Sequence, residues 1–421
     1  MTEASTAGVI TDDLRDQVLG IAEETLRGNW IDGERNGVHY GYSRPSPLHY
    51  PWQWYWDSCF HAIVWRRFDR ARAESELRSL LAGGSDDGFI GHTIFWHRHV
   101  DWQRRWTYNV TSRTAPNTST IQPPLLAWAW RIAVGDPATE PRIAAHHRWL
   151  EENRDLDGDG LLWIVQPDES GLDSSSKFDA IWGLRAHARP LFPFLIARNR
   201  RLDWDVRRVL DAGGPVLCEV VTNVLWCLAR IAAGEPSITP VIIERLWDER
   251  RGLFLDLARG EVAREGQTDP AGGDRRVRVS TWSALAPLAL PDLPEEIARR
   301  LVEEHLLDQR KYWLPFPPTS VSVEEPSFEP RKWKGTLRRL YWRGPTWINS
   351  AWLIWIGLLR HGYDPEALEM TKRLADAVAN ERLREFYEPY SGEGLGARDF
   401  GWSSLIAELV DPDPAAPASY L

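Results

Sequence analysis

Segments with a helical pattern recur in pairs along this chain, and long loops rich in aromatic residues separate the pairs. The first expected helix covers residues 11–27, where Thr11 can cap the N-terminus and Val18 and Ile21 fall on one face. Such a repeat of apolar residues is typical of a helix that packs with one side on a core. A chain built mainly from paired segments of this kind favours an all-α architecture.

The same pattern predicts about a dozen helices and few strands. Only residues 161–165 and 253–257 resemble strands, and both stretches are short. The helices are expected in antiparallel pairs, and the residues suited to chemistry are concentrated in every second connection. Since every second connection lies at the same end of such an array, this predicts an all-α (α/α)6 toroid whose long loops form one mouth. The other helices are expected near residues 58–68, 71–81, 119–133, 141–153, 186–200, 204–212, 215–233, 237–247, 280–287, 295–306, 345–361, 364–380 and 402–410.

Residues 1–421 are expected to form one domain, because no stretch rich in Pro, Ser or Gly divides them. Two irregular stretches, residues 260–278 and 316–340, are long for connections in a compact fold. We interpret the first as a surface insertion. The second is rich in proline and leads into an aromatic motif, which is typical of a lid over an active site.

Charge and composition argue against several classes of protein. The net charge is −10, so no overall basic field attracts nucleic acid. No run approaches the roughly 20 apolar residues of a membrane span, and residues 1–13 lack the pattern of a signal peptide. Cys59, Cys218 and Cys227 show neither paired nor metal-ligand spacing. We therefore expect a cytoplasmic protein without disulfides, and a homo-oligomer is compatible with the sequence.

Tryptophan is the most unusual part of the composition. The chain has 24 Trp, against 11 Tyr and 12 Phe, whereas a core made only for packing uses mainly Leu, Ile, Val and Phe. Flat rings with one polar N–H suit the faces of sugars, although aromatic side chains also fill cores. The composition therefore favours a carbohydrate ligand but does not by itself establish one.

Acidic residues are crowded between Gln166 and Asp179, a stretch that contains four carboxylates. Carboxylates that meet in a cleft raise the pKa of at least one of them, and a carboxyl that stays protonated can donate its proton to a leaving group. Asp173 is our candidate for that acid. The aromatic segment 386–390, which contains Glu388, could supply its partner. The alternative is a loop of solvated acids with no chemical role.

Four segments, in this order, resemble the inverting α-glycosidases of glycoside hydrolase family 63, and in particular its bacterial mannosylglycerate and glucosylglycerate hydrolases. The likeness spans most of the chain. The segments are Trp-Tyr-Trp-Asp-Ser at 54–58, Asp-Gly-Asp-Gly-Leu at 157–161 with Glu-Ser-Gly-Leu-Asp-Ser-Ser at 169–175, Tyr-Trp-Arg-Gly-Pro-Thr-Trp at 341–347, and Phe-Tyr-Glu-Pro-Tyr at 386–390 followed by Phe-Gly-Trp at 400–402.

The resemblance implies that Asp173 is the general acid and that Glu388 is the general base. Inversion needs a protonated carboxyl at the glycosidic oxygen and an ionised carboxylate across the sugar, with one water between them. Asp57 can bind sugar hydroxyls, although a helix N-cap is nearly as good an interpretation of that residue alone, and both roles could hold at once. The expected substrate-binding residues are Tyr50, Trp54, Trp56, Asp57, Tyr108, Gln122, Arg189, Tyr341, Trp342, Gly344 and Trp402.

The expected reaction releases a hexose and glycerate from mannosylglycerate, and also from glucosylglycerate. Trehalases share the toroid but usually carry Pro-Gly-Gly-Arg-Phe where this chain has other residues at 49–53, so trehalose is a poor substrate candidate. Three alternatives stay open, namely another α-glucosidase or trehalase-like hydrolase, a sugar epimerase on the same fold, and a toroid that binds sugars without turnover.

No metal or cofactor is expected, and the partner is a small-molecule glycoside. Residues 155–160 begin like a calcium loop, but Gln166 stands where a bidentate Glu is needed. His92 and its neighbours fit no common zinc spacing, and a role in lining a loop is the better interpretation. Glycerate is an anion, so cations near the motifs should hold it. The candidates are Arg113, Lys177, Arg185, Arg189 and Arg343.

Overall fold

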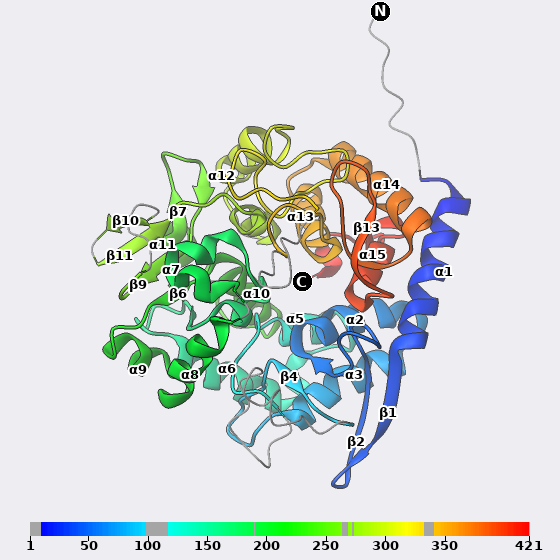
Figure 1. The fold of residues 1–421 in the computed structure, drawn as a ribbon. Helices are drawn as coiled ribbons and strands as arrows, with labels where there is room; N and C mark the ends of the chain where they lie inside the picture. The colour runs from blue at the N-terminus through cyan, green and yellow to red at the C-terminus, as the bar shows by residue number, and fades with distance from the viewer. Residues whose placement is uncertain are drawn as a thin grey trace, which may run out of the picture.

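In the computed structural model, six helical segments of the described residues form an inner ring in which each segment contacts the next. The last segment also contacts the first, so the ring closes. Figure 1 shows the chain running once around this ring, with the red C-terminal part beside the blue N-terminal part. The structure describes residues 10–97, 117–188, 190–262, 268–271, 273–331 and 341–420. The inner segments are α2 (Tyr55–Phe68), α5 (Leu126–Ala133), α10 (Val220–Ala232), the 3₁₀ helix Trp282–Ala289, α13 (Ile348–Arg360), and the 3₁₀ helix Gly401–Leu405 with α15 (Ile406–Val410).

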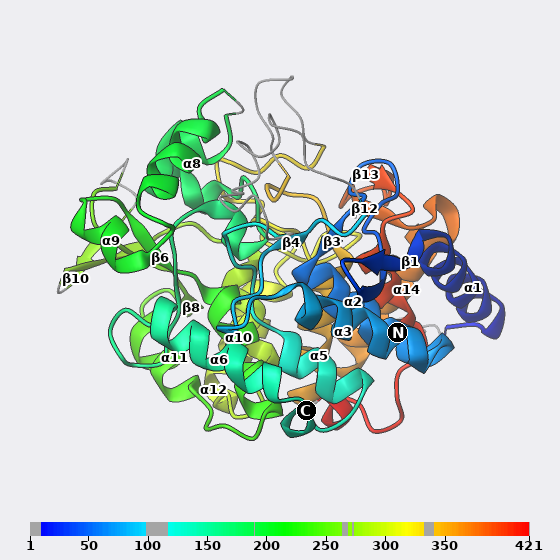
Figure 2. The ribbon, with the colours of Figure 1, turned by 90° about the horizontal axis from the view of Figure 1, so that it is seen from below.

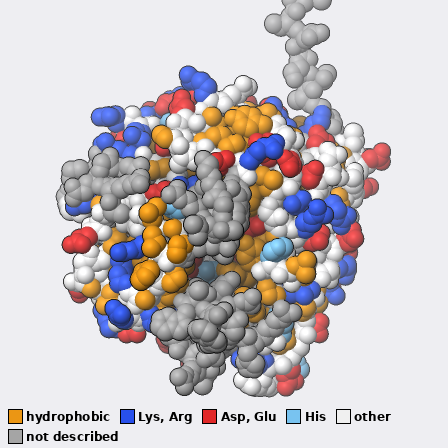
Figure 3. Space-filling model, in the orientation of Figure 1, with side chains coloured by type: hydrophobic (Ala, Val, Ile, Leu, Met, Phe, Trp, Pro, Cys, Tyr) orange, Lys and Arg blue, Asp and Glu red, His pale blue; other side chains and the backbone are white. Residues whose placement is uncertain are grey.

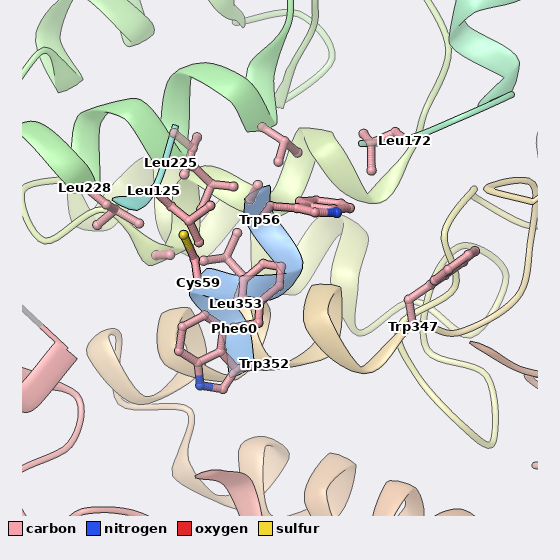
Figure 4. Close-up of a cluster of buried hydrophobic side chains, with 14 of the residues drawn as sticks. Trp56, Cys59, Phe60, Leu125, Leu172, Leu225, Leu228, Trp347, Trp352 and Leu353 are labelled. Atoms are coloured by element: carbon pink, nitrogen blue, oxygen red, sulfur yellow. The ribbon is translucent and has the colours of Figure 1, made fainter. Parts of the chain in front are cut away.

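The inner helices are mainly apolar and are buried along most of their length, as expected for helices at the centre of the molecule. All residues of α2 from Tyr55 to Trp65 are buried, and so is the whole helix Trp282–Ala289. In Figure 4, α2 lies among side chains from distant parts of the chain, among them Leu125 and Trp352. The buried Tyr420 packs its ring edge-on against Trp352, so the C-terminal residues complete this core.

The outer helices show one buried face each. In α1 (Asp12–Asn29) the buried residues include Val18, Ile21, Ala22 and Thr25, at the expected helical spacing. Thr11 caps this helix by accepting a hydrogen bond from the Leu14 amide, as the sequence predicts. The remaining α-helices are α3 (Arg70–Gly83), α6 (Pro141–Arg154), α7 (Asp179–Trp182), α8 (Phe192–Arg201), α9 (Val206–Asp211), α11 (Thr239–Leu246), α12 (Glu295–Arg300) with the π-helix Leu301–Leu306, and α14 (Asp364–Glu381). Short 3₁₀ helices cover Pro137–Thr139, Pro167–Ser170, Ser176–Phe178, Gly183–Ala186 and Ala418–Tyr420.

The predicted all-α (α/α)6 fold is confirmed, and the short strands are accessory to it. Both expected strand regions contain strands. The hairpin of β1 and β2 was missed, although Asn36 and Gly37 at its turn have the positive φ values of a two-residue hairpin turn. The pairs are β1 (Trp30–Arg35) with β2 (Val38–Ser43), β3 (Gln53–Trp54) with β4 (Thr93–Ile94), β7 (Trp247–Asp248) with β8 (Leu253–Phe254), and β12 (Arg384–Tyr387) with β13 (Gly394–Arg398).

One five-stranded sheet lies outside the ring, with the strand order β10-β11-β9-β6-β5. All its paired strands are antiparallel. The expected surface insertion at residues 260–278 contributes the hairpin of β10 and β11 at one end of this sheet. The strands are β5 (Trp163–Ile164), β6 (Val216–Cys218), β9 (Leu257–Arg259), β10 (Thr268–Ala271) and β11 (Asp274–Val277).

Several helix starts differ from the prediction for local reasons. Helix α5 begins at Leu126 rather than near 119, because two prolines precede it. The interpretation of Asp57 as an N-cap is wrong: α2 already begins at Tyr55, and Asp57 lies inside its first turn.

The segment 316–340, expected to form a lid, is described only as far as residue 331. Its first part is bonded into the body. The Phe316 amide donates to the Pro389 carbonyl at 2.9 Å, and the Ser320 amide donates to the Pro345 carbonyl at 3.2 Å. Residues 319–322 are buried. The lid therefore stays a prediction for the later residues, of which 332–340 lie outside the described part of the chain.

Candidate active site

A cavity of about 360 Å³ opens at the end of the ring where the inner helices α2, α5 and α13 begin. Figure 2 shows β3, β4, β12 and β13 at this end of the molecule and the C-terminus at the other. In Figure 3 hydrophobic side chains gather around the hollow in the middle of this face. Trp54, Trp56 and Asp57 enter the cavity from the start of α2, and Trp347 enters it just before α13. The toroid therefore brings together residues that are far apart in sequence.

Tryptophans form the apolar floor of this pocket. The rings of Trp342 and Trp347 stack with centroids 3.8 Å apart and planes 9° apart. Trp402 meets Trp56 edge-on at 5.2 Å and lies 5.6 Å from Trp347. All four side chains line the cavity. Their flat faces offer apolar surface of the kind that packs against the C–H side of a sugar ring.

Four carboxylates line the same cavity: Asp57, Asp168, Asp173 and Glu385. Asp57 is only 3% exposed. Burial raises the pKa of Asp57 to about 7, and the nearby charge of Glu385 adds to this rise, whereas His61 opposes it. At neutral pH the Asp57 carboxyl is therefore near the midpoint of its titration, and it lines the cavity where a ligand would bind.

Glu385, on β12, is held from both sides. Its Oε1 accepts a hydrogen bond from the Tyr50 hydroxyl at 3.0 Å, and its Oε2 accepts one from the Ala397 amide at 2.9 Å. Gly396 has a φ of +71°, and a Cβ at that position would lie 2.6 Å from Glu385 Oε2. The glycine thus leaves room for the carboxylate, which is fixed at the pocket wall with its two oxygens in different surroundings.

Glu388, our sequence candidate for the base, is not among the residues that line the cavity. Its Oε2 accepts hydrogen bonds from the amides of Tyr390 and Ser391, at 3.0 and 2.7 Å, and from the Ser391 hydroxyl at 2.8 Å. These bonds are local to the turn between β12 and β13. Glu388 therefore stabilises that turn, and Glu385, three residues earlier, is the carboxylate that β12 presents to the pocket.

Asp168 and His92 form a polar corner of the pocket. Asp168 Oδ1 accepts a hydrogen bond from Gln166 Nε2 at 2.6 Å, and its Oδ2 lies 3.8 Å from His92 Nδ1. The His92 ring meets Trp54 edge-on at 4.8 Å. Burial lowers the pKa of His92 to about 3, so this imidazole is neutral at pH 7. The expectation that His92 lines a loop at the site agrees with this position.

Asp173 lies on a further part of the pocket wall, formed by lining residues between 171 and 187, and is the exposed member of the four. Gly171, two residues earlier, has a φ of +71°, and a Cβ there would come within 2.6 Å of the Trp56 ring. The sequence Gly-Leu-Asp can therefore pass close to the tryptophan floor only with glycine at this position. This close approach helps to determine where Asp173 enters the pocket.

Two other acids of the crowded stretch are structural. Glu169 is fully buried and accepts hydrogen bonds from Arg154 at 3.0 and 2.7 Å. Asp179 is paired with Arg343. The expected role of Lys177 as a cation for glycerate is wrong, because its ammonium is buried between Glu219 and Asp256.

These features agree with the comparisons with known proteins. The family model described as "Mannosylglycerate hydrolase MGH1-like glycoside hydrolase domain" matches residues 50–224 and 229–403. The chain belongs to this glycoside hydrolase family. It is therefore a glycosidase, as the resemblance to family 63 implied.

Individual relatives of this glycosidase support the same assignment. It is 29% identical to a mannosylglycerate hydrolase of Thermus thermophilus, over 86% of this chain and 95% of that protein. It is 26% identical to a glucosylglycerate hydrolase of Mycolicibacterium hassiacum, over 85% and 91% of the two chains. The structure of a family 63 mannosylglycerate hydrolase from Thermus thermophilus with Tris and D-glycerate superposes with a TM-score of 0.71 at 25% identity, over 94% and 99% of the chains.

Most of the expected substrate-binding residues of the glycosidase line the pocket. Gly344 is an exception: it is not among the lining residues, and its amide donates to Ser320 Oγ at 2.8 Å. Tyr108 and Arg189 lie outside the described residues, as does Arg113. The expected residues that line the cavity are Tyr50, Trp54, Trp56, Asp57, Gln122, Asp173, Tyr341, Trp342 and Trp402.

Sequence reasoning missed Glu385, Asp168, His187 and Trp347 as pocket residues of the glycosidase. For Glu385 a signal existed, because glycines at 394 and 396 follow it at the distance of a hairpin partner. Among the described residues no group of three or more His, Cys, Asp or Glu side chains could hold a metal ion. In the turn that resembles a calcium loop, Asp157 and Asp159 are paired with Arg245.

Proposed function

We propose that this glycosidase hydrolyses an α-hexosyl glycerate with inversion, and that mannosylglycerate and glucosylglycerate are its substrates. In this proposal Asp173 is the general acid and Glu385, in place of Glu388, is the general base. The observation that carries the proposal is the position of Glu385, which lines the same cavity as Asp173 and is held there by Tyr50 and by a main-chain amide.

The chemistry follows from these two carboxyl groups. Asp173 gives its proton to the glycosidic oxygen while the bond from that oxygen to the anomeric carbon breaks. A water on the other face of the sugar attacks the anomeric carbon, and Glu385 takes a proton from that water. The products are glycerate and a hexose of inverted configuration, and proton exchange with solvent returns both carboxyl groups to their starting states.

The floor of the pocket supports a single hexose as the group that is transferred. The stacked Trp342 and Trp347 offer an apolar surface, and Asp57 offers a carboxyl that accepts or donates hydrogen bonds near neutral pH. A cavity of about 360 Å³ suits a ligand of disaccharide size better than a polymer.

Recognition of the glycerate carboxylate is the finer part of the proposal, and it rests on the relatives named above. The guanidinium of Arg343 and the ammonium of Lys177 are ion-paired in the described structure. The proposal therefore relies on hydroxyl and amide donors such as Tyr341 and Gln122, which line the cavity.

Kinetics on mannosylglycerate, glucosylglycerate and the matching α-hexosyl glycerols would test the substrate. A charged hydrogen bond to the carboxylate contributes about 1.5–3 kcal/mol, so the neutral glycerol glycosides should have at least about tenfold lower kcat/KM. Equal kcat/KM values for the glycerol and glycerate glycosides would contradict recognition of the anion and would make the enzyme a general α-glycosidase.

Proton NMR of the anomer released first would test the mechanism. Inversion gives the β-anomer of the hexose from an α-glycoside, and it later mutarotates. Release of the α-anomer would contradict the proposed roles of Asp173 and Glu385.

We also propose that the enzyme works in the cytoplasm. All three cysteines are buried and unpaired, which suits a reducing compartment. No helix within the described ranges has the length and apolar character needed to cross a membrane.

A further inference from the structure

Arg343 occupies a buried position directly behind the wall that carries Asp173. It is 6% exposed, and it is not among the residues that line the cavity. Its two terminal nitrogens donate to both carboxylate oxygens of Asp179, at 2.8 and 2.7 Å. This paired geometry is a strong form of the arginine–carboxylate interaction, and it helps to fix the orientation of the guanidinium plane.

The third donor of the same guanidinium reaches the residue that follows Asp173. Arg343 Nε donates to the main-chain carbonyl of Ser174 at 2.8 Å. The Tyr341 amide donates to the Ser174 hydroxyl oxygen at 3.0 Å, so the segment that contains Arg343 holds Ser174 at two points. Ser174 has a φ of +61°, a backbone conformation that a residue with a side chain adopts only at a cost. These bonds compensate for that cost and fix the turn immediately after Asp173.

The surroundings of the pair between Arg343 and Asp179 favour the ionised form of the Asp179 carboxyl. Burial alone would raise the pKa of Asp179, but hydrogen bonds from His187 and Arg343 outweigh it and hold the pKa of that carboxyl below its usual range. His187 Nδ1 lies 2.8 Å from Asp179 Oδ1 and 3.3 Å from the Arg343 guanidinium. His187 also lines the cavity, so the same cluster borders the pocket.

We propose that Arg343 is a positioning residue for the general acid: through Ser174 and Asp179 it keeps the carboxyl of Asp173 at the glycosidic oxygen. The proposal rests on the proposed function, because it takes Asp173 as the proton donor. It assigns to Arg343 a role that differs from the glycerate contact expected from the sequence. Asp173 is exposed, so its own burial does not hold it in place, and an error of about 1 Å in the position of a reacting group can cost on the order of 10²-fold in rate.

Two substrates with different leaving groups can distinguish a misplaced general acid from a general loss of structure. Hydrolysis of an α-hexosyl glycerate needs a proton on the leaving oxygen. An α-hexosyl fluoride needs little help, because fluoride leaves as an anion while water attacks the anomeric carbon and Glu385 takes the proton of that water. A variant with a misplaced acid therefore loses activity on the glycerate glycoside and keeps it on the fluoride.

The experiment measures kcat and KM on both substrates for the wild type, Arg343→Lys and Asp173→Asn. Lysine keeps the charge but cannot donate to Ser174 and to both oxygens of Asp179 at once. We expect Arg343→Lys to lower kcat on the glycerate glycoside about 10–100-fold, with less than about threefold change in KM and in kcat on the fluoride. Asp173→Asn should show the same pattern with a larger loss.

A matched control is Arg67→Lys, because Arg67 also pairs with a buried carboxylate, Glu408, but at the C-terminal end of α2. Its ratio of the two kcat values should equal that of the wild type. If Arg343→Lys lost both activities equally while Asp173→Asn kept the fluoride activity, the positioning role would be overturned. If Asp173→Asn itself lost both equally, the assignment of the acid would be wrong instead.

Should Arg343→Lys fail to fold, Asp179→Asn loosens the same ion pair without removing the arginine. It should give the same preference for the fluoride, with a smaller loss on the glycerate glycoside. An Asp179→Asn enzyme that folds, with a melting temperature near that of the wild type, and shows the ratio of the wild type would equally overturn the proposal.

Discussion

The two walls of the pocket hold their carboxylates in opposite ways. The inner wall, made by α2 and β12, buries Asp57 and Glu385, which are 3% and 7% exposed. The outer wall, made by lining residues between 171 and 187, leaves Asp173 exposed. On the inner wall, burial changes the proton affinity of the acid, as the raised pKa of Asp57 shows. On the outer wall, hydrogen bonds to the hydroxyl and to the main-chain carbonyl of Ser174 hold the residue next to the acid.

This difference indicates which property each wall controls. Desolvation acts on charge, so changes on the inner wall should alter pH dependence. Hydrogen bonds to the main chain act on geometry, so changes on the outer wall should alter kcat for substrates that need a proton.

The largest expected effect separates two glutamates of one hairpin. Glu385→Gln should lower kcat by ~10²–10⁴-fold, because a general base at the inner wall has no substitute. Glu388→Gln should lower it less than about tenfold, because the bonds of Glu388 to other described residues lie within the turn. Steady-state kinetics on mannosylglycerate would measure both. If Glu388→Gln lowered kcat more than Glu385→Gln did, Glu388 would be the general base and Glu385 would not.

Asp57→Asn should change how stability depends on pH. The pKa of Asp57 is raised to about 7 in the folded state, against 3.8 as the ordinary value. Between these pH values the folded protein binds a proton that the unfolded chain has released, so the stability of the wild type falls as pH rises from about 4 to 7. The loss from this one group amounts to at most about 4 kcal/mol.

In the Asn variant this contribution is absent. Its melting temperature relative to the wild type should therefore rise as the pH goes from 5 to 7.5, as thermal unfolding at a series of pH values would show. A constant difference across that range would mean that burial on the inner wall does not set the charge of Asp57.

On the outer wall, Gly171→Ala should destabilise the protein by about 2–4 kcal/mol, because the new methyl group meets the Trp56 ring in a left-handed backbone. Gly158→Ala is the matched control. Gly158 has a similar φ of +74° but nothing within 4 Å of a new Cβ, so its cost should be about 1–2 kcal/mol. Only Gly171→Ala should also lower kcat. Urea unfolding and kinetics would measure both, and equal stability losses would mean that Trp56 does not constrain the outer wall.

The smallest expected effect concerns the turn before the outer wall. Asp157 and Asp159 are paired with arginines, so added Ca²⁺ or a chelator should shift the melting temperature by less than about 1 °C. A clear rise with millimolar Ca²⁺ would show that a cation, rather than Arg245 and Arg259, holds this turn.

The sequence predicted the ring well, because burial on all sides leaves a strong pattern. The apolar α13 and the one-sided α1 are readable without tertiary contacts. The pocket was predicted in part, since Asp57 and Trp342 lie in recognisable motifs. What failed depended on the conformation of short irregular pieces. Glu385 and Glu388 stand three residues apart, and only the bulged pairing of β12 with β13 decides which of them faces the pocket.

The partners in buried ion pairs could not be predicted from the sequence either. Arg343 and Asp179 are 164 residues apart, and nothing local to either residue indicates the pairing. The same holds for Lys177, whose partners Glu219 and Asp256 come from two further segments. A charged residue beside a motif suggests a ligand contact, whereas burial and a partner decide its actual role.

The hydrogen bond between Tyr50 and Glu385 joins positions 335 residues apart, across the place where the ring closes. During synthesis the ribosome releases Tyr50 early and Glu385 near the end, so the inner wall cannot exist while most of the chain is being made. A partly synthesised chain therefore has no working site to act on its substrate in the cell. Enzyme activity in an extract accordingly counts only molecules that were translated almost to the end and whose ring has closed.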